Sequence, residues 1–488
     1  MSSGSETTAN DTPRQATIAV DLGAESCRVS LLRWPQSESG SKPHISLVHR
    51  FPNGPVQAED SSLRWPYDAI VAGVEEGMRR CADLAPEGIA SVGVDGWAVD
   101  YVRLNAENQP LAAPFCYRDE RNAAAEPLLH EKISPARLRE ITGLQLQPLN
   151  TLYQLYADRL DGLDAGTGWL NLPESLLARW SGVRVSEYTN ATHTQMVELE
   201  SRQWSREILN AADIDASTMP QIVLPGTVLG SMQGPLADLE AFRHTKVIAP
   251  ACHDTASAIT GIPAEAGRWG YISCGTWSLL GIPLDHPVND ERARTHQFTN
   301  MGLDGSRYLL QKNMNGMWLL KQCMDAWCKV GAAWSIEDLC EAACRTEMPD
   351  VALDVDDPEL HRMGDMPARI NAQRKQYGLP ALDESPAGAP VMASLIFHSL
   401  ASRYAKVFGQ LEELAGHTID CIYFVGGGSR NALLREWTQQ ATGKTICTGA
   451  VESSSVGNFA LQLAALDAKG QSAVHEDVAR YARMLCAI

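Results

Sequence analysis

The sequence predicts an α/β protein built from two similar domains that face each other across a cleft. At 488 residues the chain is too long for one hydrophobic core. A strand, a glycine-bearing turn and a second strand occur at Val20–Ser30 and again at Gly270–Gly281. This likeness indicates an internal duplication of one βββαβα-type unit. We expect residues 1–15 to be a disordered tail, residues 16–245 to form the first domain and residues 246–488 to form the second.

The charge and composition are those of an acidic enzyme. The formal net charge is −18 and no basic run offsets it, which argues against nucleic acid and membranes as partners. No apolar stretch reaches the roughly twenty residues that span a bilayer, and Met1–Gln15 lacks the apolar core of a signal peptide. The 12 cysteines are scattered singly, which favours reduced thiols. We therefore expect a cytoplasmic protein, a monomer or small homo-oligomer, that binds small molecules.

The first candidate site lies at the predicted hairpin near the N-terminus. Thr17–Gly23 is a short apolar strand that contains Asp21, and Cys27–Arg33 is a second strand after a tight turn. The hairpin tip offers backbone amides and the Ser26 hydroxyl to a phosphate, and Asp21 lies where a hydrated Mg²⁺ could reach it. The alternative is an ordinary hairpin in which Asp21 helps only to make the turn.

A second group of polar side chains falls on the predicted strand pair Ile89–Val102. Asp95, Trp97 and Asp100 lie at its bend. Two carboxylates and an indole suit a sugar, because carboxylates accept hydrogen bonds from hydroxyls and an indole covers an apolar ring face. The alternative is that Trp97 belongs to the core and that Asp100 is solvated.

The candidate general base is Asp254. The apolar run Lys246–Pro250 predicts a short buried strand, and His253, Asp254 and Thr255 follow it. The small residues after Thr255 indicate a helix that begins at Asp254 or Thr255. Ligands of open α/β sheets bind at the carboxyl ends of strands, so this carboxylate is placed to act on one. The alternative is that Asp254 only caps the helix.

Two glycine-bearing turns complete the predicted cleft. Gly275 and Thr276 lie at the turn of the second hairpin, and the strand Asp420–Val425 runs into Gly426–Gly428 before the helix Leu433–Thr442. Such glycines let a phosphate or a flat base approach the backbone, although a lone glycine triplet is often only a tight turn. Two facing halves, each with a phosphate hairpin, would clamp a nucleotide between them.

The region between these turns supplies one more candidate. The apolar stretch Tyr308–Trp327 is expected to be helical after Lys312 and Asn313. Asn313 either presents its amide to the cleft or caps that helix. Residues 346–389 are acidic and proline-rich and are expected to form a loop insertion with a short helix inside.

Taken together, these motifs resemble the FGGY carbohydrate kinases, a branch of the actin-like ATPases, and among them the rhamnulokinases. The resemblance runs from about Thr17 to the end of the chain. The matching segments are Val20–Ala24 with Arg28, His49–Asn53, Val94–Asp100, Cys116–Asp119, His253–Ser257, Gly364–Ile370, Phe424–Gly428 and Gly457-Asn458.

The resemblance implies two ribonuclease H-like domains with a central interdomain cleft. It also implies ATP- and Mg²⁺-dependent phosphorylation of L-rhamnulose at its 1-hydroxyl, a step of L-rhamnose catabolism. Carried over residue by residue, Asp254 matches the catalytic base, with Asp21 reaching the metal through water. The residues implied to bind the sugar are Asp95, Trp97, Ala98, His253, Thr255 and Asn313. Those implied to bind ATP are Ala24, Glu25, Ser26, Cys27, Arg28, Thr276, Lys321, Gly426, Gly427 and Gly428.

Three positions depart from the family pattern. Cys27 and Ala98 stand where the family usually has glycine, and Lys321 stands where it usually has glutamine. The methyl group of Ala98 would narrow the sugar pocket or shift the preferred ketose, and Lys321 would meet a phosphate as a charge rather than as an amide. Two alternatives therefore stay open: a kinase of another ketose such as L-fuculose or L-ribulose, and a non-catalytic ATP-binding regulator with the same clamp.

Overall fold

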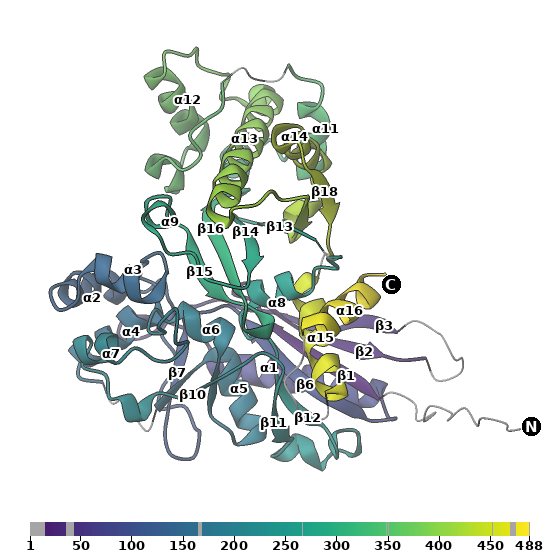
Figure 1. The fold of residues 1–488 in the computed structure, drawn as a ribbon. Helices are drawn as coiled ribbons and strands as arrows, with labels where there is room; N and C mark the ends of the chain where they lie inside the picture. Colours follow the sequence, from purple (N-terminus) through teal and green to yellow (C-terminus); the bar gives the residue numbers. More distant parts are fainter. Residues whose placement is uncertain are drawn as a thin grey trace, which may run out of the picture.

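The computed structural model shows two lobes, each built on a six-stranded sheet, joined at a narrow waist (Figure 1). The predicted tail at residues 1–14 lies outside the described residues. The structure describes residues 15–35, 43–163, 168–265, 267–347, 349, 351–450, 452–468 and 475–487.

The sheet of the first lobe has the strand order β11-β12-β6-β1-β2-β3. The hairpin predicted near the N-terminus is β1 and β2, which pair antiparallel, and β6 joins β1 in parallel. The strands are β1 (Ala16–Leu22), β2 (Ser26–Arg33), β3 (His44–Pro52), β6 (Ile89–Gly96), β11 (Thr227–Ser231) and β12 (Lys246–Ala249).

The sheet of the second lobe repeats this pairing. Its order is β15-β16-β14-β13-β17-β18, with β13 antiparallel to β14 and parallel to β17, as β1 is to β2 and β6. The predicted duplication is therefore confirmed by the topology. The strands are β13 (Trp269–Cys274), β14 (Trp277–Leu284), β15 (Thr299–Gly302), β16 (Tyr308–Asn315), β17 (Cys421–Val425) and β18 (Thr445–Thr448).

Two expectations about local structure were wrong. The predicted strand pair Ile89–Val102 is not a hairpin, because β6 ends at Gly96 and the next strand, β7, pairs with β8 in a separate ribbon. The stretch before Trp318 is extended rather than helical, because it forms the buried strand β16, which is paired with β14 on one side and with β15 on the other. Asn313 therefore lies on a strand, and Met317 occupies the N-cap of α10.

Helices cover both sheets. On the first sheet, α1 (Tyr67–Leu84) and α5 (Leu172–Ser181) cover one face, and α13 (Ala389–Ala415) packs on the second sheet. The other elements are α2 (Arg121–His130), α3 (Pro135–Thr142), α4 (Thr151–Leu160), α6 (Tyr188–His193), α7 (Arg206–Ala211), α8 (Asp254–Thr260), α9 (Glu291–Thr295), α10 (Trp318–Lys329), α11 (Ile336–Ala343), α12 (Met366–Gln376), α14 (Ala432–Thr442) and the strand pairs β4–β5 (Val56–Gln57, Leu63–Arg64), β7–β8 (Tyr101–Leu104, Gly168–Asn171) and β9–β10 (Val185–Glu187, Gln221–Val223).

The last two helices return to the first lobe. Figure 1 shows α15 (Ser453–Asp467) and α16 (His475–Cys486), in yellow, against the purple strands β1 and β2. Phe459 and Tyr481 are buried with Ala19 and Leu32 in one apolar cluster. The first sheet therefore has α1 and α5 on one face and α15 on the other, and its second cover comes from the end of the chain.

The predicted domain boundary at residue 245 falls within the first sheet. Strand β12 begins at Lys246 and lies next to β6, so residues on both sides of position 245 share that sheet. The helix α8 follows β12 and crosses α15 at two glycines. A Cβ atom at Gly457 would overlap the carbonyl oxygen of Ser257, and one at Gly261 would overlap that of Ser453. This close crossing fixes α8 against the first lobe.

Candidate active site in the cleft between the lobes

A cavity of about 440 Å³ opens between the two lobes at the N-terminal end of α8. It brings together the first hairpin, the start of α8, the glycine turn after β17 and the start of α15. The residues that line it are Asp21, Gly23, Arg28, Asp254, Thr255, Ala258, Ser273, Gly426, Gly427, Arg430, Glu452, Ser453 and Ser454. Segments that lie up to 433 residues apart in the sequence thus meet in one site.

Asp254 is the first residue of α8, and His253 rather than Asp254 occupies the N-cap position. The alternative that Asp254 serves only as the cap is therefore not what the structure shows. Its side chain is 36% exposed to the cavity, and the Thr255 hydroxyl donates to Oδ1 at 3.2 Å. Burial raises the pKa of Asp254 to about 6, and the bond from Thr255 opposes that rise. At neutral pH the carboxylate is mostly ionised and able to accept a proton.

His253 lies beside Asp254 and stays neutral. Its Nε2 is 3.4 Å from Asp254 Oδ1, and its ring centroid is 4.0 Å from that of His193 on α6. Burial lowers the pKa of His253 to about 3, and burial together with His253 lowers the pKa of His193. The neutral His253 imidazole borders the carboxylate without pairing with it as a cation.

Two buried polar residues hold the turn that presents Asp254. The backbone N–H of Cys252 donates to Glu187 Oε2 at 2.8 Å, and that of His253 donates to Thr189 Oγ1 at 3.2 Å. Burial raises the pKa of Glu187 to about 8, although the three donors around it favour the ionised form. Sequence reasoning missed both residues, because their partners lie more than sixty positions later in the chain and no local motif marks them.

The carboxylate of Asp21 is buried at the floor of the cavity. Arg28 Nη1 donates to its Oδ2 at 3.0 Å and the Ser454 hydroxyl donates to the same oxygen at 2.9 Å. Burial raises the pKa of Asp21, Arg28 opposes this, and the nearby Asp254 adds to it. Ser454 was not predicted, since it joins the site only when α15 returns to the first lobe.

Asp21 belongs to a row of four charged residues that runs across the first sheet. Each member is the register partner of the next on four adjacent strands, and we call this set the charged row. Its members are Asp95 on β6, Asp21 on β1, Arg28 on β2 and Arg50 on β3. The two acids lie together and the two arginines lie together, with an ion pair at the junction.

Asp95 does not face the sugar side of the cavity as expected. It is 0% exposed, and the Asn458 amide of α15 donates to its Oδ2 at 2.6 Å. Burial, followed by the neighbouring Asp21, raises the pKa of Asp95 well above its ordinary value. A direct contact between Asp95 and a sugar is therefore corrected to a structural role, because helix α15 covers that face of β6.

Trp97 belongs to the core, which was the alternative interpretation. Its ring lies 4.4 Å from that of Trp65, and its N–H donates to Asp100 Oδ2 at 3.0 Å. Asp100 is likewise buried rather than solvated, and burial raises its pKa to about 6. Ala98, 8% exposed, follows in a turn that lies beside His253, because the Gly96 N–H donates to the Cys252 carbonyl at 3.0 Å.

The neighbouring strand β3 holds the tip of the first hairpin. Arg50 donates to the Ser26 hydroxyl from Nε at 3.2 Å and from Nη2 at 3.1 Å. The Cys27 side chain points the other way, into the core, where burial raises the pKa of its thiol to about 12. Ala24 and Glu25 lie at the tip, with Glu25 exposed. Cys27 can thus offer only its backbone to a ligand.

The glycine turn reaches the cavity, whereas the second hairpin reaches its rim. Gly426 has φ of 79°, a conformation that favours glycine, and it lines the cavity together with Gly427. A Cβ atom at Gly428 would overlap the Cys274 sulfur, so this glycine allows the turn to pack on β13. Thr276 is exposed at the turn between β13 and β14.

The remaining two predicted residues do not line this cavity. Asn313 projects from β16 with its Oδ1 buried and without a hydrogen-bond partner among the described residues. Lys321 is exposed on α10. The structure therefore does not bring Asn313 or Lys321 together with Asp254 in the cavity.

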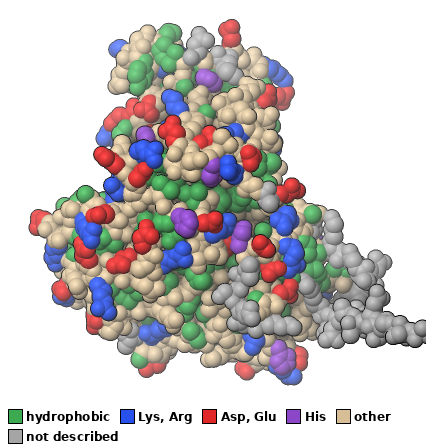
Figure 2. Space-filling view, viewed as in Figure 1, with side chains coloured by type: hydrophobic (Ala, Val, Ile, Leu, Met, Phe, Trp, Pro, Cys, Tyr) green, Lys and Arg blue, Asp and Glu red, His purple; other side chains and the backbone are tan. Residues whose placement is uncertain are grey.

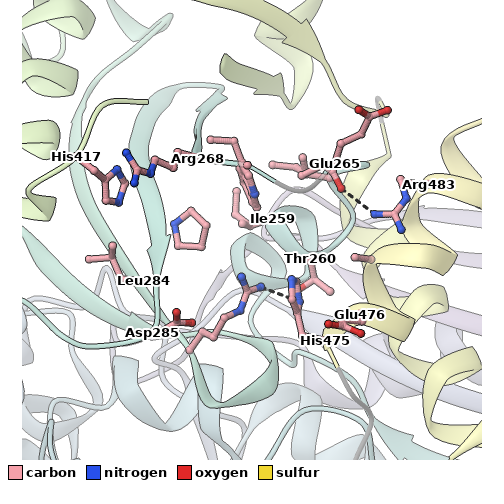
Figure 3. Close-up of a pocket in the computed structure, with 17 residues that line it drawn as sticks. Ile259, Thr260, Glu265, Arg268, Leu284, Asp285, His417, His475, Glu476 and Arg483 are labelled. Atoms are coloured by element: carbon pink, nitrogen blue, oxygen red, sulfur yellow. Dashed lines mark hydrogen bonds between the residues drawn. The ribbon is translucent and has the colours of Figure 1, made fainter. Parts of the chain in front are cut away.

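A larger cavity of about 840 Å³ lies at the opposite, C-terminal end of α8 (Figure 3). Arg307 Nη2 is 2.9 Å from His475 Nδ1 there, and Arg483 donates to the Ala264 carbonyl at 2.9 Å. None of the residues predicted to bind ATP or sugar lines it. The surface view shows acidic, basic and histidine side chains gathered along the waist between the lobes (Figure 2). Cavity volume alone would therefore have selected the wrong candidate, because the larger cavity does not contain Asp254.

The cavity with Asp254 suits a hydrated divalent cation. In the part of the chain that the structure describes, no three His, Cys, Asp or Glu side chains are grouped to hold a metal by themselves. Mg²⁺ is usually bound by one or two carboxylates, with waters and substrate phosphates as its other ligands. Asp21 and Asp254 both line the cavity and meet that requirement.

Comparison with known proteins decides the family. Residues 16–261 match the N-terminal domain of the FGGY family of carbohydrate kinases, and residues 270–466 match its C-terminal domain. The chain belongs to the FGGY family of carbohydrate kinases. It is thus a phosphotransferase with a sugar hydroxyl as acceptor, and kinases of this family take the phosphoryl group from ATP, generally with a divalent metal ion. The alternative of a non-catalytic regulator is not supported.

Similar proteins span the whole kinase. A rhamnulokinase of Oceanobacillus iheyensis is 32% identical over 457 residues, which cover 93% of this chain and 94% of the relative. A rhamnulokinase of Pectobacterium atrosepticum is 33% identical over 461 residues, 92% of this chain and 88% of the relative. Each match therefore covers most of this chain and most of the relative.

Solved structures share its fold. A xylulose kinase from Rhodospirillum rubrum has a TM-score of 0.76 at 14% identity and covers 95% of this chain and 92% of its own. A glycerol kinase from Plasmodium falciparum, solved with ADP, has a TM-score of 0.73 at 13% identity and covers 96% and 92%. The predicted two-domain actin-like architecture is confirmed. Among its described helices, none combines the length and apolar character needed to cross a membrane.

Proposed function

We propose that this kinase transfers the γ-phosphoryl group of ATP to the 1-hydroxyl of L-rhamnulose, as a step of L-rhamnose breakdown. The observation that carries the proposal is the position of Asp254, a partly exposed carboxylate with a pKa of about 6 in a cavity shared by both lobes. The choice of sugar is supported by the relatives at 32% and 33% identity, which are rhamnulokinases.

Asp254 acts as the general base in this proposal. Its carboxylate accepts the proton of the 1-hydroxyl while the sugar oxygen attacks the γ-phosphorus. The bond from that phosphorus to the oxygen bridging the β- and γ-phosphates breaks, and ADP leaves with the electron pair. A bound Mg²⁺ would neutralise charge on the phosphate oxygens, with Asp21 holding one of its waters. Arg28 keeps the Asp21 carboxylate in place through its 3.0 Å bond.

The remaining contacts divide between the two substrates. For ATP we propose the hairpin Ala24–Arg28, Thr276 at the second hairpin and the glycine turn Gly426–Gly428, whose backbone amides are suited to phosphate oxygens. Lys321 is proposed to meet the nucleotide at the edge of the cleft. For the sugar we propose His253, Thr255 and Asn313, with Ala98 at the pocket wall.

The turn that holds Ala98 favours a second candidate, a kinase of another ketose such as L-fuculose or L-ribulose. Val99 has φ of 73°, which is strained for a β-branched residue. Its carbonyl accepts hydrogen bonds from Thr151 at 2.7 Å and from Gln154 at 3.3 Å. These two hydrogen bonds hold the turn in its strained conformation, so the methyl group of Ala98 would narrow the space left for a bulky sugar.

A substrate panel separates the two candidates. ADP release should be measured with L-rhamnulose, L-fuculose, L-ribulose, D-xylulose and glycerol, and the phosphorylated carbon should be located by NMR. The highest kcat/KM with L-rhamnulose and a 1-phosphate product support the first candidate. A preference for another ketose supports the second, and preference for glycerol would exclude both.

Asp254→Asn tests the mechanism. The substitution removes the base but keeps the size of the side chain, so kcat should fall by about 10²–10⁴-fold while ATP binding changes little. Asp285→Asn is the matched control, because Asp285 lines the other cavity and should keep the wild-type rate. A near-wild-type rate in Asp254→Asn would contradict the role of this carboxylate.

A further inference from the structure

The segment His49–Asn53 contacts the first hairpin at several points but has no role in the proposal so far. The backbone N–H of Asn53 donates to the Glu25 carbonyl at 2.9 Å, and its side-chain amide donates to the Gly23 carbonyl at 2.9 Å. Arg50 donates to the Ser26 hydroxyl at 3.1 and 3.2 Å. Asn53 thus occupies the carbonyls of Gly23 and Glu25 at the tip, and the backbone amides of the tip are the groups that a ligand could use.

Strand alternation places Arg50 on the same face as the cavity residues. Arg50 is the register partner of Arg28, and Arg28 lines the cavity. Phe51, the next residue, packs the opposite way, against α1. Ser26 lies two residues before Arg28 and so shares its face, while Cys27 between them is buried in the core.

The positive charge of Arg50 is not offset locally. Arg28 lies 3.0 Å from Asp21 and 3.7 Å from Glu452, whereas no carboxylate in the described part of the chain comes within 4.0 Å of Arg50. In a chain with a formal net charge of −18, a guanidinium without an acidic partner at this tip is notable. It supplies the local positive potential that a polyphosphate requires.

The two hydrogen bonds from Arg50 determine that the Ser26 hydroxyl can act as a donor to a further group. A guanidinium only donates, so the Ser26 oxygen is the acceptor in both bonds and its own proton is free for a third partner. An oxygen atom of a phosphate group is such an acceptor, and charge-assisted bonds of this kind are stronger than neutral ones.

We propose that Arg50 is a positioning residue for the polyphosphate of the nucleotide. It orients the Ser26 hydroxyl as a donor to a phosphate oxygen and places a positive charge behind it, while Asn53 holds the hairpin tip open. The ligand class is a nucleoside di- or triphosphate, and the phosphates rather than the base are recognised. This inference rests on the ATP-binding role proposed above for the hairpin.

Nucleotide binding without sugar tests the proposal. We would measure the affinities of Arg50→Gln, Arg50→Lys, Ser26→Ala and the double variant Arg50→Gln/Ser26→Ala for ADP and for adenosine by calorimetry. Arg50→Gln should weaken ADP binding about tenfold and leave adenosine binding within twofold. Arg50→Lys should recover part of the loss because the charge remains. The double variant should lose less ADP affinity than the sum of the two single losses, since part of the effect of Arg50 passes through Ser26.

Steady-state rates provide the second readout. KM for ATP should rise about tenfold in Arg50→Gln, while kcat and the KM for the sugar stay within threefold. The matched control is Arg80→Gln. Arg80, on α1, is also exposed, and its Nη1 lies 3.1 Å from Nδ1 of His49, the residue before Arg50 on β3. The kcat and KM values of this variant should not change.

Three results would overturn the proposal. These are unchanged ADP affinity in Arg50→Gln, additive losses in the double variant, and equal losses for ADP and adenosine, which would show a general loss of structure. Failure of the proposed function would look different. In that case no sugar of the panel would be phosphorylated, or ADP would not bind to the wild-type protein at all.

Discussion

A row of register partners crosses four strands in each sheet. The row in the first sheet consists of charged residues, whereas the row in the second sheet has no ionisable side chain. In both lobes these strands are the first strand of the hairpin, its antiparallel partner, the strand beyond that partner and the parallel neighbour of the first strand. In the first lobe it is the charged row, Asp95, Asp21, Arg28 and Arg50. In the second lobe the corresponding residues are Val425, Ser273, Leu279 and Asn313.

The difference shows that the duplicated fold and the chemistry are separable. The second row, without any ionisable group, supports the same strand pairing, so the charges are not needed to build the sheet. A buried ion pair also gives little net stability against apolar residues of similar size. The charges in the first row therefore indicate function, and two of their bearers, Asp21 and Arg28, line the cavity.

Among changes within the charged row, replacement of Asp21 by the residue of the second row should have the largest effect. Asp21→Ser places at this position the residue that the second row has at Ser273. It removes the carboxylate proposed to hold a metal-bound water and leaves Arg28 without its 3.0 Å partner. We expect kcat to fall about 100-fold and a higher Mg²⁺ concentration for half-maximal rate in steady-state assays.

Ser273→Ala is the matched control for this change. Ser273 also lines the cavity but carries no charge, so its loss should alter kcat by less than about threefold. Equal effects of the two substitutions would show that the rows are equivalent after all.

The buried end of the charged row predicts a smaller effect, on stability. Asn458→Leu removes the 2.6 Å donor to Asp95 and leaves that carboxyl with neither oxygen hydrogen-bonded among the described residues. The free energy of unfolding should fall by about 1–3 kcal/mol in urea denaturation. In the double variant Asp95→Val/Asn458→Leu, position 95 carries the valine that the second row has at Val425. No carboxyl is then left without a partner, so most of the lost free energy of unfolding should be recovered. A further loss in the double variant would contradict the comparison.

The change in rate expected near neutral pH from the titration of Asp254 is the smallest of these effects. Among the described residues that the second sheet and the glycine turn after β17 contribute to the cavity, none is a carboxylate that could take its place. Because its pKa is raised from 3.8 to about 6, the ionised, proton-accepting form is lost as the pH falls through about 6. The kcat/KM should therefore drop tenfold per unit below that pH and be nearly flat above about 7. Rates from pH 5 to 9 provide the measurement; a midpoint near 4 would rule out the raised pKa in the free enzyme.

The parts of the site that could be predicted from sequence are local. The hairpin β1–β2, the start of α8 at Asp254 and the glycine turn after β17 each depend on neighbours within a few residues, through strand alternation, turn glycines and helix starts. The duplication was visible for the same reason, since two similar local patterns recur. These features sufficed to single out the residue proposed as the base and most of the residues proposed to contact phosphate.

The parts that were missed depend on partners far along the chain. Ser454 and Asn458 meet Asp21 and Asp95 only because α15 packs on the first sheet. Glu187 supports the turn before Asp254 from a different strand. Trp97 was predicted to bind the sugar, because the local sequence does not distinguish a tryptophan at a ligand site from one in the core. No periodicity or turn signal contains such long-range pairings.

The return of α15 and α16 to the first lobe has a consequence for how the chain matures on the ribosome. Gln462 donates to the carbonyl of Ile18 at 2.9 Å, although 444 residues separate them. Domains usually fold in order as they emerge, yet here one face of β1 stays uncovered until α15 has been translated. The first sheet is therefore completed only after the strands of the second sheet have been translated. A nascent chain that stalls before residue 453 leaves an apolar sheet face that chaperones would have to shield.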